Sequence, residues 1–181
     1  MVLDTTEFHI NELNYVIRSA RVTDAGELSQ VRLQIDGETE YLDREKGEAF
    51  IDEDGFRQLI NSDSEKDTNI FLVAKADGRI VGFSRCEGSS LRRQAHIVEF
   101  GICILQAYWG YGIGRNLLNK TVEWADASQI KKIALKVLET NNKAISLYEK
   151  FGFQTEGILR KDKLLSNGKY YNTVVMGRVI D

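Results

Sequence analysis

The chain has 181 residues, of which 43% are hydrophobic and 28% are charged, with no proline. This length and composition predict one globular domain with its own core and exclude a disordered or collagen-like chain. The longest uninterrupted apolar run, residues 70–74, is far shorter than the ~20 residues that span a bilayer, so no membrane association is expected. Because the net charge is −3, a broad nucleic-acid-binding face is not expected either.

Cysteine and histidine usage indicates a reducing compartment and no metal site. The two cysteines, Cys86 and Cys103, are too few for a disulfide scaffold, and residues 1–10 lack the basic and apolar segments of a signal peptide. The sequence therefore favours the cytoplasm. The two histidines, His9 and His96, have no second ligand at the spacing that zinc sites require.

Acidic residues are concentrated in one segment of the chain. Residues 36–67 hold twelve acidic and four basic residues, whereas the rest of the chain is net basic. A solvated acidic surface is the ordinary interpretation of such a segment. The alternative is an acidic lip beside a cationic substrate.

The N-terminal part of the chain predicts a strand followed by two helices. Asp24 and Glu27 have the spacing of a capping box, and the apolar residues after them recur on one helical face. The expected elements are an extension outside the core over residues 1–14, a strand over 15–22, a helix over 24–35 and a short helix around 56–60, with 38–54 unassigned.

Two turn signals place hairpins at both ends of the remaining chain. Asp77-Gly78 and Asn167-Gly168 favour tight turns, and strand-like segments flank both dipeptides. Gly152 is expected to end a helix. Because hairpins are absent from a purely parallel doubly wound sheet, a mixed α/β fold is expected. The predicted strands cover residues 69–75, 79–85, 96–105, 133–138, 153–160 and 170–180, and the predicted helices cover 112–127 and 141–151.

A glycine-rich segment follows an apolar strand and opens an amphipathic helix. Unpaired backbone N–H groups at a helix start carry partial positive charge, and glycines let phosphates approach that backbone closely. The segment therefore predicts an anion site, in particular for a diphosphate, with a tight turn that binds nothing as the alternative. Its residues are Trp109, Gly110, Tyr111, Gly112, Ile113, Gly114 and Arg115.

Two common phosphate-binding loops do not fit this spacing. A P-loop ends in Gly-Lys-Ser/Thr, whereas Arg115 and Asn116 follow Gly114. A dinucleotide fingerprint needs a third glycine where Arg115 stands, and an acid about twenty residues later, where Ile133 and Ala134 lie. Both loops are therefore disfavoured.

A second motif lies downstream of the glycine-rich segment. It matches the pattern Val-x-x-x-Asn-x-x-Ala-x-x-x-Tyr-x-x-x-Gly-Phe at Val137, Asn141, Ala144, Tyr148, Gly152 and Phe153. Together with this pattern, residues 109–114 resemble the coenzyme A motif Gln/Arg-x-x-Gly-x-Gly/Ala of the GNAT acyltransferase superfamily, with Trp109 as a departure in the first position. The resemblance extends over residues 15–179 and is weakest over 38–68, which in the family shapes the acceptor site.

The resemblance implies an α/β fold with a mixed, largely antiparallel central sheet of about seven strands flanked by helices. It implies one N-acetyltransferase domain over residues 1–181, with its core over 15–181. The reaction implied is direct transfer of an acetyl group from acetyl-CoA to a primary amine in a ternary complex. The acceptor is a small molecule or a peptide N-terminus, and a homodimer fits the habit of the family. Residues 156–160 and 168–171 resemble the branch of ribosomal-protein N-terminal and small-amine acetyltransferases.

Tyr148 is the candidate general acid. Its spacing from Ala144 and Phe151 on one helical face alone indicates a core tyrosine. The resemblance instead implies that it lies beside the coenzyme sulfur, where a phenol with a pKa near 10 still holds its proton at neutral pH.

Glu99 is the candidate general base. It stands within an apolar strand, where desolvation would raise its pKa into a useful range, and several family members use a glutamate on this strand. The alternatives are an edge-facing or ion-paired carboxylate, with His96, Glu87 or a water chain accepting the proton. Cys103 is not expected to be a nucleophile, because no histidine partner is evident.

Coenzyme contacts are implied in three places. A bulge in the central strand is expected to free backbone amides toward the thioester, and the glycine-rich segment to bind the diphosphate through its amides. Asn141 has helix capping as its alternative role. The residues implied are Ile102, Cys103, Ile104, Trp109, Gly110, Tyr111, Gly112, Ile113, Gly114, Arg115, Asn141 and Ala144.

Two rival functions remain open from the sequence. A coenzyme A-binding sensor or partner module needs the glycine-rich segment but neither Glu99 nor Tyr148. A nucleotide-binding protein would use the same segment for a different phosphate ligand.

Overall fold

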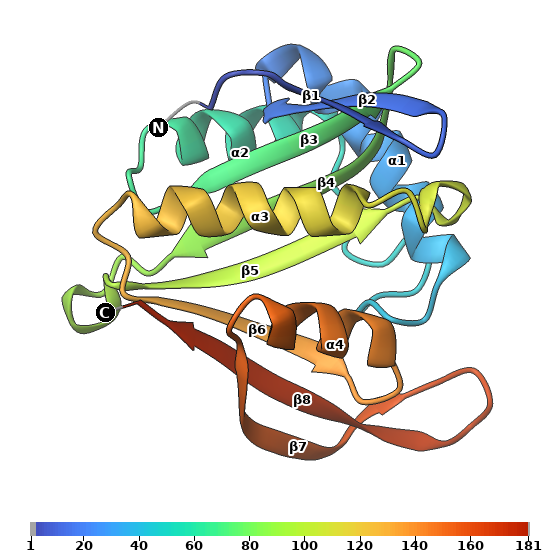
Figure 1. Ribbon diagram of the computed structural model, residues 1–181. Coiled ribbons are helices and arrows are strands. Elements are labelled where there is room, and N and C mark those ends of the chain that lie inside the picture. Colours follow the sequence, from blue (N-terminus) through green and yellow to red (C-terminus); the bar gives the residue numbers. More distant parts are fainter. Residues whose placement is uncertain (1–2, 181) are drawn as a thin grey trace.

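The structure, a computed structural model, describes residues 3–180, which form one sheet with helices on both faces (Figure 1). The mixed, largely antiparallel sheet implied by the resemblance is confirmed, with eight strands instead of about seven. The strands lie in the order β1-β2-β3-β4-β5-β6-β8-β7. The elements are β1 (Thr6–Ile10), β2 (Leu13–Ser19), α1 (Ala25–Glu38), α2 (Glu53–Ser64), β3 (Ile70–Ala76), β4 (Arg79–Gly88), β5 (Ile97–Ile104), α3 (Ile113–Asp126), β6 (Lys132–Leu138), α4 (Asn142–Lys150), β7 (Gln154–Leu164) and β8 (Tyr170–Val179).

The additional strand is β1, within the segment expected to be an extension outside the core. β1 pairs with β2 through a two-residue turn in which Asn11 and Glu12 both have positive φ angles, 48° and 66°. Such a turn suits the twist of a hairpin, but it normally carries glycine at its second position. Because Glu12 replaces that glycine, the sequence gives no hairpin signal here.

Two helices cover each face of the sheet. α3 packs on β3, β4 and β5, whereas α1 packs on β4 and β5 from the opposite face, and α2 on β3. Figure 1 shows α3 in front of β4 and β5, and α4 in front of β6 and β8. The alternation along β5 follows from these layers: Val98 and Phe100 are buried toward α3 and α4, and Glu99 between them turns to the α1 face.

The start of α1 differs from the predicted capping box. Asp24 accepts hydrogen bonds from the Arg21 backbone N–H at 2.8 Å and from both terminal nitrogens of Arg18 at 2.7 and 2.8 Å. Glu27 accepts from the Ile80 backbone N–H at 2.6 Å instead of capping the helix. The Asp24 carboxylate therefore binds the backbone at the start of the short 3-10 turn Val22–Asp24 instead of capping α1.

The Arg18–Asp24 ion pair predicts a pH-dependent stability. Burial raises the pKa of Asp24, but the hydrogen bonds from Arg18 and Arg21 and the charges of Arg18 and Lys75 outweigh it and hold the pKa below its usual value. Because the folded pKa is depressed, the stabilisation is complete above the ordinary aspartate pKa of about 4 and is lost as pH falls through the folded pKa.

We expect Asp24→Asn to lower the free energy of unfolding by about 3 kcal/mol at pH 7, because it leaves Arg18 buried without its counter-ion. The difference from the parent chain should shrink as pH falls below about 4. Urea unfolding at pH 7, 5, 4 and 3 measures it, with the exposed Asp67→Asn as control. A difference that stays constant across this series would contradict the linkage.

Candidate active site

The sheet opens between its two parallel strands. β5 and β6 pair only at Ile97–Lys132, Val98–Ile133 and Glu99–Ala134. Beyond Glu99, β5 continues to pair with β4 as far as Ile104 but has no partner on its β6 side. Figure 1 shows the two strands diverging toward the N-terminus of α3. A run of β5 backbone is therefore free along the side that faces the opening.

The direction of the free backbone groups follows from the antiparallel register. The Leu105 N–H donates to Val81 O on β4, so alternate residues before it, Cys103 among them, also turn their backbone groups toward β4. Ile102 and Ile104 consequently turn theirs toward the opening. The bulge implied by the resemblance is absent, since β5 runs in unbroken register with β4. Strand divergence, rather than a bulge, frees these amides.

The glycine-rich segment forms the connection from β5 into α3. Gly110 and Gly112 have φ angles of 89° and 74°, which favour glycine, and Gly112 precedes the first helical residue. Among the described residues, no acceptor contacts the backbone N–H groups of residues 110–115, and the first amide to be bonded is that of Asn116, to Gly112 O. Consecutive unbonded amides at a helix start are the geometry that binds anions.

Two tyrosines hold this segment in place, and the sequence did not single out either of them. The Tyr15 hydroxyl donates to Tyr111 O at 3.3 Å and accepts from the Asn116 amide at 2.6 Å. Tyr41 stacks on the Trp109 ring, with centroids 6.3 Å apart, while Trp109 Nε1 donates to Ile104 O at 3.0 Å. Trp109 thus supports the loop through its side chain. These contacts join residues far apart in the chain, so no local pattern predicts them.

Tyr148 lies in α4 with 7% of its surface exposed. Its ring packs edge-on against Phe100 of β5 and against Phe153. The hydroxyl has no hydrogen-bond partner in residues 3–180, yet it is not among the fully enclosed polar atoms, so it retains contact with solvent. Burial raises the pKa of Tyr148 to about 12, with the Cys103 thiol adding to the shift. The phenol is therefore protonated at neutral pH.

Glu99 is exposed, which differs from the desolvated position expected for it. It is the last β5 residue paired with β6 and lies opposite Glu87 on β4. Glu87 accepts from Arg85, whereas Glu99 makes no ion pair among the described residues. Its carboxylate lies on the α1 face, across the sheet from Tyr148. The two candidate groups thus approach the end of the β5–β6 pairing from opposite faces.

The N-terminus of α4 carries the remaining candidates. Asn141 is the N-cap, and its side chain accepts from the Ala144 N–H at 3.3 Å, so the capping alternative is present. Ala144 is half-buried, one turn before Tyr148. The Cys103 side chain lies on the α1 face, where burial raises its pKa to about 11 against the charges of Arg44 and Arg32. A protonated thiol agrees with the absence of a nucleophilic role.

Most of the acidic segment is engaged within the protein. Several of its carboxylates bind arginine, lysine or backbone N–H groups, so they do not form a free acidic lip. These contacts are Asp36–Arg44, Asp43–Lys163, Asp63–Arg85, Glu53–Arg57, Glu38 with the Gln106 N–H, Glu40 with the Ser166 N–H, Glu48 with the Glu45 N–H and Asp52 with the Gly55 N–H.

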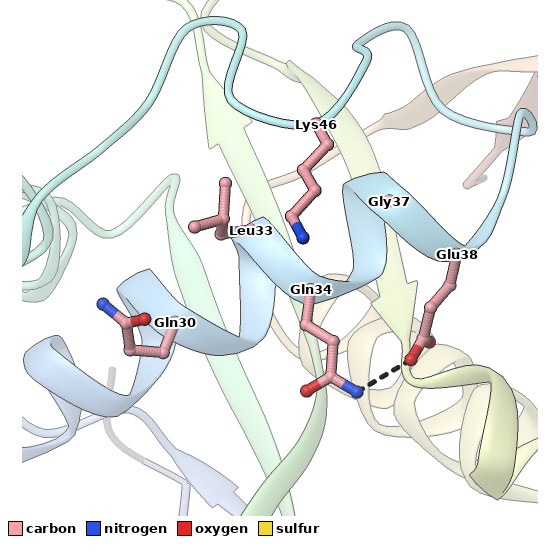
Figure 2. Close-up of a pocket in the computed structure, with 6 residues that line it drawn as sticks. All are labelled: Gln30, Leu33, Gln34, Gly37, Glu38 and Lys46. Carbon is pink, nitrogen blue, oxygen red and sulfur yellow. Dashed lines mark hydrogen bonds between the residues drawn. The ribbon is translucent and has the colours of Figure 1, made fainter.

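A hollow of about 370 Å³ is lined by residues of α1 and by Lys46. Figure 2 shows it beside α1, with the Lys46 ammonium directed toward the helix and Gln34 bonded to Glu38. It shares no residue with the β5–β6 opening or the glycine-rich segment. In residues 3–180, no three metal-binding side chains gather, and no helix has the length and apolar character to cross a membrane.

Comparisons with known proteins identify the family of the chain. The profile of the Acetyltransferase (GNAT) family matches residues 35–153. The chain is 34% identical over 109 residues to L-amino acid N-acetyltransferase AaaT of Escherichia coli, covering 60% of this chain and 67% of that protein. It is 32% identical over 121 residues to the [ribosomal protein bS18]-alanine N-acetyltransferase of Haemophilus influenzae, covering 67% and 78%. A GNAT-family acetyltransferase structure from Streptococcus pneumoniae superposes with a TM-score of 0.88 at 28% identity, covering 92% and 99%.

Proposed function

Because the chain belongs to the acetyltransferase (GNAT) family, we propose that it transfers the acetyl group of acetyl-CoA to a primary amine by direct transfer in a ternary complex. The observation that carries this proposal is the run of unbonded N–H groups over residues 110–115, at the end of the strand whose edge amides at Ile102 and Ile104 are also free. A diphosphate and the pantetheine arm attached to it would bind these two sets of donors in sequence.

The chemistry assigned to the site needs a proton acceptor, oxyanion donors and a proton donor. The free amine attacks the thioester carbonyl carbon, and its proton passes to Glu99 directly or through water. The edge amides of Ile102 and Ile104 stabilise the tetrahedral oxyanion. When the carbon–sulfur bond breaks, Tyr148 donates its proton to the departing thiolate. Positioning both substrates in one complex supplies much of the rate.

A screen of thiol release tests the proposed function. Acetyl-CoA is mixed with the chain and with single amines, amino acids, polyamines or short peptides, and free thiol is followed by a colorimetric reagent. We expect thiol release that depends on an amine and matches an N-acetylated product by mass spectrometry. Binding of acetyl-CoA by calorimetry without release across the panel would favour a coenzyme sensor instead. Greater thermal stabilisation by ATP than by coenzyme A would favour a nucleotide-binding protein.

The proton-acceptor role of Glu99 has a separate prediction. We expect Glu99→Gln to lower kcat/KM about tenfold near pH 7 and less at higher pH, where more of the amine is already deprotonated. The matched variant is Glu87→Gln, at the facing position of β4. A pH–rate profile of both variants measures the effect. If Glu87→Gln alone loses activity, the role belongs to Glu87, and if neither does, His96 or a water chain accepts the proton.

A further inference from the structure

One arginine on the α1 face is buried without a carboxylate partner. Arg32 is 9% exposed, and its guanidinium donates to the Ala49 backbone carbonyl at 2.8 Å. Among the described residues it forms no ion pair. A buried cation is costly unless an opposite charge compensates it. Arg32 is therefore a largely buried cation without a counter-ion among the described residues.

The surroundings of Arg32 show why no protein group supplies that charge. Ser29, Arg32 and Asp36 lie on successive turns of α1 and face the loop after it, with Ser29 bonded to Ile51 O. Asp36 is already bound by Arg44 through two hydrogen bonds of 2.8 and 3.1 Å. Arg32, Asp36 and Arg44 together carry one net positive charge. Because Asp36 and Arg44 neutralise each other, this charge belongs to Arg32.

The charge also lies close to the proposed reaction centre. The helix α1 that carries Arg32 packs on β5, and the positive charges of Arg44 and Arg32 oppose the rise in the pKa of the Cys103 thiol that burial causes. Cys103 separates the two edge amides of Ile102 and Ile104. The arginine therefore lies on the same face of the sheet as Glu99, near the segment of β5 that would hold the thioester.

Arg32 has donors to spare for a ligand. Within residues 3–180, one of its nitrogens is bonded to protein, and the others are not among the fully enclosed unpartnered atoms, so they reach solvent. A guanidinium presents its N–H groups in a planar fork that matches a carboxylate. Burial and the repulsion from Arg44 lower the pKa of Arg32 without removing its charge at neutral pH, because arginine titrates so far above it.

We infer that Arg32 binds a carboxylate carried by the acceptor, so the acceptor is a small amino acid rather than a polyamine or a protein N-terminus. This inference rests on the proposed transferase function. The single net positive charge matches one carboxylate, whereas Asp36 beside it would repel a second negative charge. A polyamine would place further cations against Arg32, and in a protein N-terminus the α-carboxyl group is consumed in the peptide bond.

The test compares amino acids with their own amides. Glycine, alanine, methionine and phenylalanine are each assayed against the matching amino acid amide, with kcat/KM expressed per concentration of free amine, because the two amino groups differ in basicity. We expect the parent chain to prefer the acid of at least one pair by tenfold or more. Arg32→Gln keeps a donor for the Ala49 carbonyl but removes the charge, and it should reduce this acid-to-amide ratio about tenfold. Arg32→Lys should retain part of the preference.

A control variant and two contrary results distinguish failure of the carboxylate site from failure of the proposed transferase function. Arg79→Gln removes an exposed arginine at the β3–β4 turn and should leave the ratio unchanged. If acids and amides are acetylated equally, or if Arg32→Gln lowers both equally, Arg32 has no carboxylate ligand, although the transferase function stands. If no amine is acetylated while acetyl-CoA still binds, the transferase function itself is overturned and the carboxylate site falls with it.

Discussion

Replacing Tyr148 with phenylalanine is expected to lower kcat for acetyl transfer by about 100-fold or more, while the affinity for acetyl-CoA changes little. Phe100 of β5 and Phe153 pack against the phenol ring, and its raised pKa keeps the hydroxyl protonated at neutral pH. Without the hydroxyl, the thiolate must leave unprotonated or take its proton from water. The loss therefore falls on the chemical step.

The packing around Tyr148 makes this substitution informative. The hydroxyl forms no hydrogen bond in the described residues, so phenylalanine keeps the ring contacts and leaves no partner unsatisfied. The free energy of unfolding should stay within about 0.5 kcal/mol of the parent value. Steady-state kinetics, calorimetry with acetyl-CoA and urea unfolding are compared, with the exposed Tyr170→Phe as control. Full turnover by Tyr148→Phe would leave Tyr148 only the core role that its spacing also allows.

Local turn chemistry predicted much of the sheet. At Asp77-Gly78 both residues have positive φ angles, 49° and 77°, as a two-residue hairpin turn requires. At Asn167-Gly168 only the glycine is left-handed, with φ of 74°, and the Gly168 N–H bonds to Leu165 O. That turn is wider than the dipeptide signal alone suggests, but it joins the predicted strands. Such turns are predictable because their strain falls on one or two residues.

Features fixed by distant contacts were not predictable. Glu27 leaves its expected capping position because the Ile80 N–H, 53 positions away, provides a stronger partner. The role of Arg32 depends on Ala49 O and on the prior engagement of Asp36 by Arg44, neither of which leaves a trace in local periodicity. In each case, the partner is supplied by the tertiary arrangement and not by neighbouring positions of the same helix.

The candidate site also combines features that local sequence predicts with features that depend on distant contacts. Glycine spacing placed the free amides of residues 110–115 correctly at the start of a helix, because backbone conformation at Gly110 and Gly112 is a local property. The prediction that Glu99 is desolvated was wrong. Its apolar neighbours on both sides along the strand point to the other face of the sheet and do not bury its side chain. Burial of a strand residue is decided by what covers its own face, and that depends on the topology.

Gly110 provides the sharpest test of the diphosphate site. We expect Gly110→Asp to weaken acetyl-CoA binding about 100-fold, because it places a carboxylate among the amides that would bind the phosphates. Gly110 has φ of 89°, and among the described residues no atom outside its two chain neighbours lies within 4 Å of the place that a Cβ would take. Aspartate and asparagine tolerate left-handed backbone better than other residues, which limits the strain. Calorimetry at low and moderate salt measures the dissociation constant.

Two matched variants separate charge from backbone strain. Gly110→Asn has nearly the same shape without the charge, so it should weaken binding much less than Gly110→Asp. Gly78→Asp carries the same charge at another left-handed glycine with open space, φ 77°, in the β3–β4 turn, and should bind acetyl-CoA as the parent chain does. Added salt should reduce the difference in dissociation constant between Gly110→Asp and Gly110→Asn, since it screens the repulsion between the new carboxylate and the phosphates. If Gly110→Asp binds acetyl-CoA as tightly as Gly78→Asp, the diphosphate lies elsewhere, and the free amides at the start of α3 have another purpose.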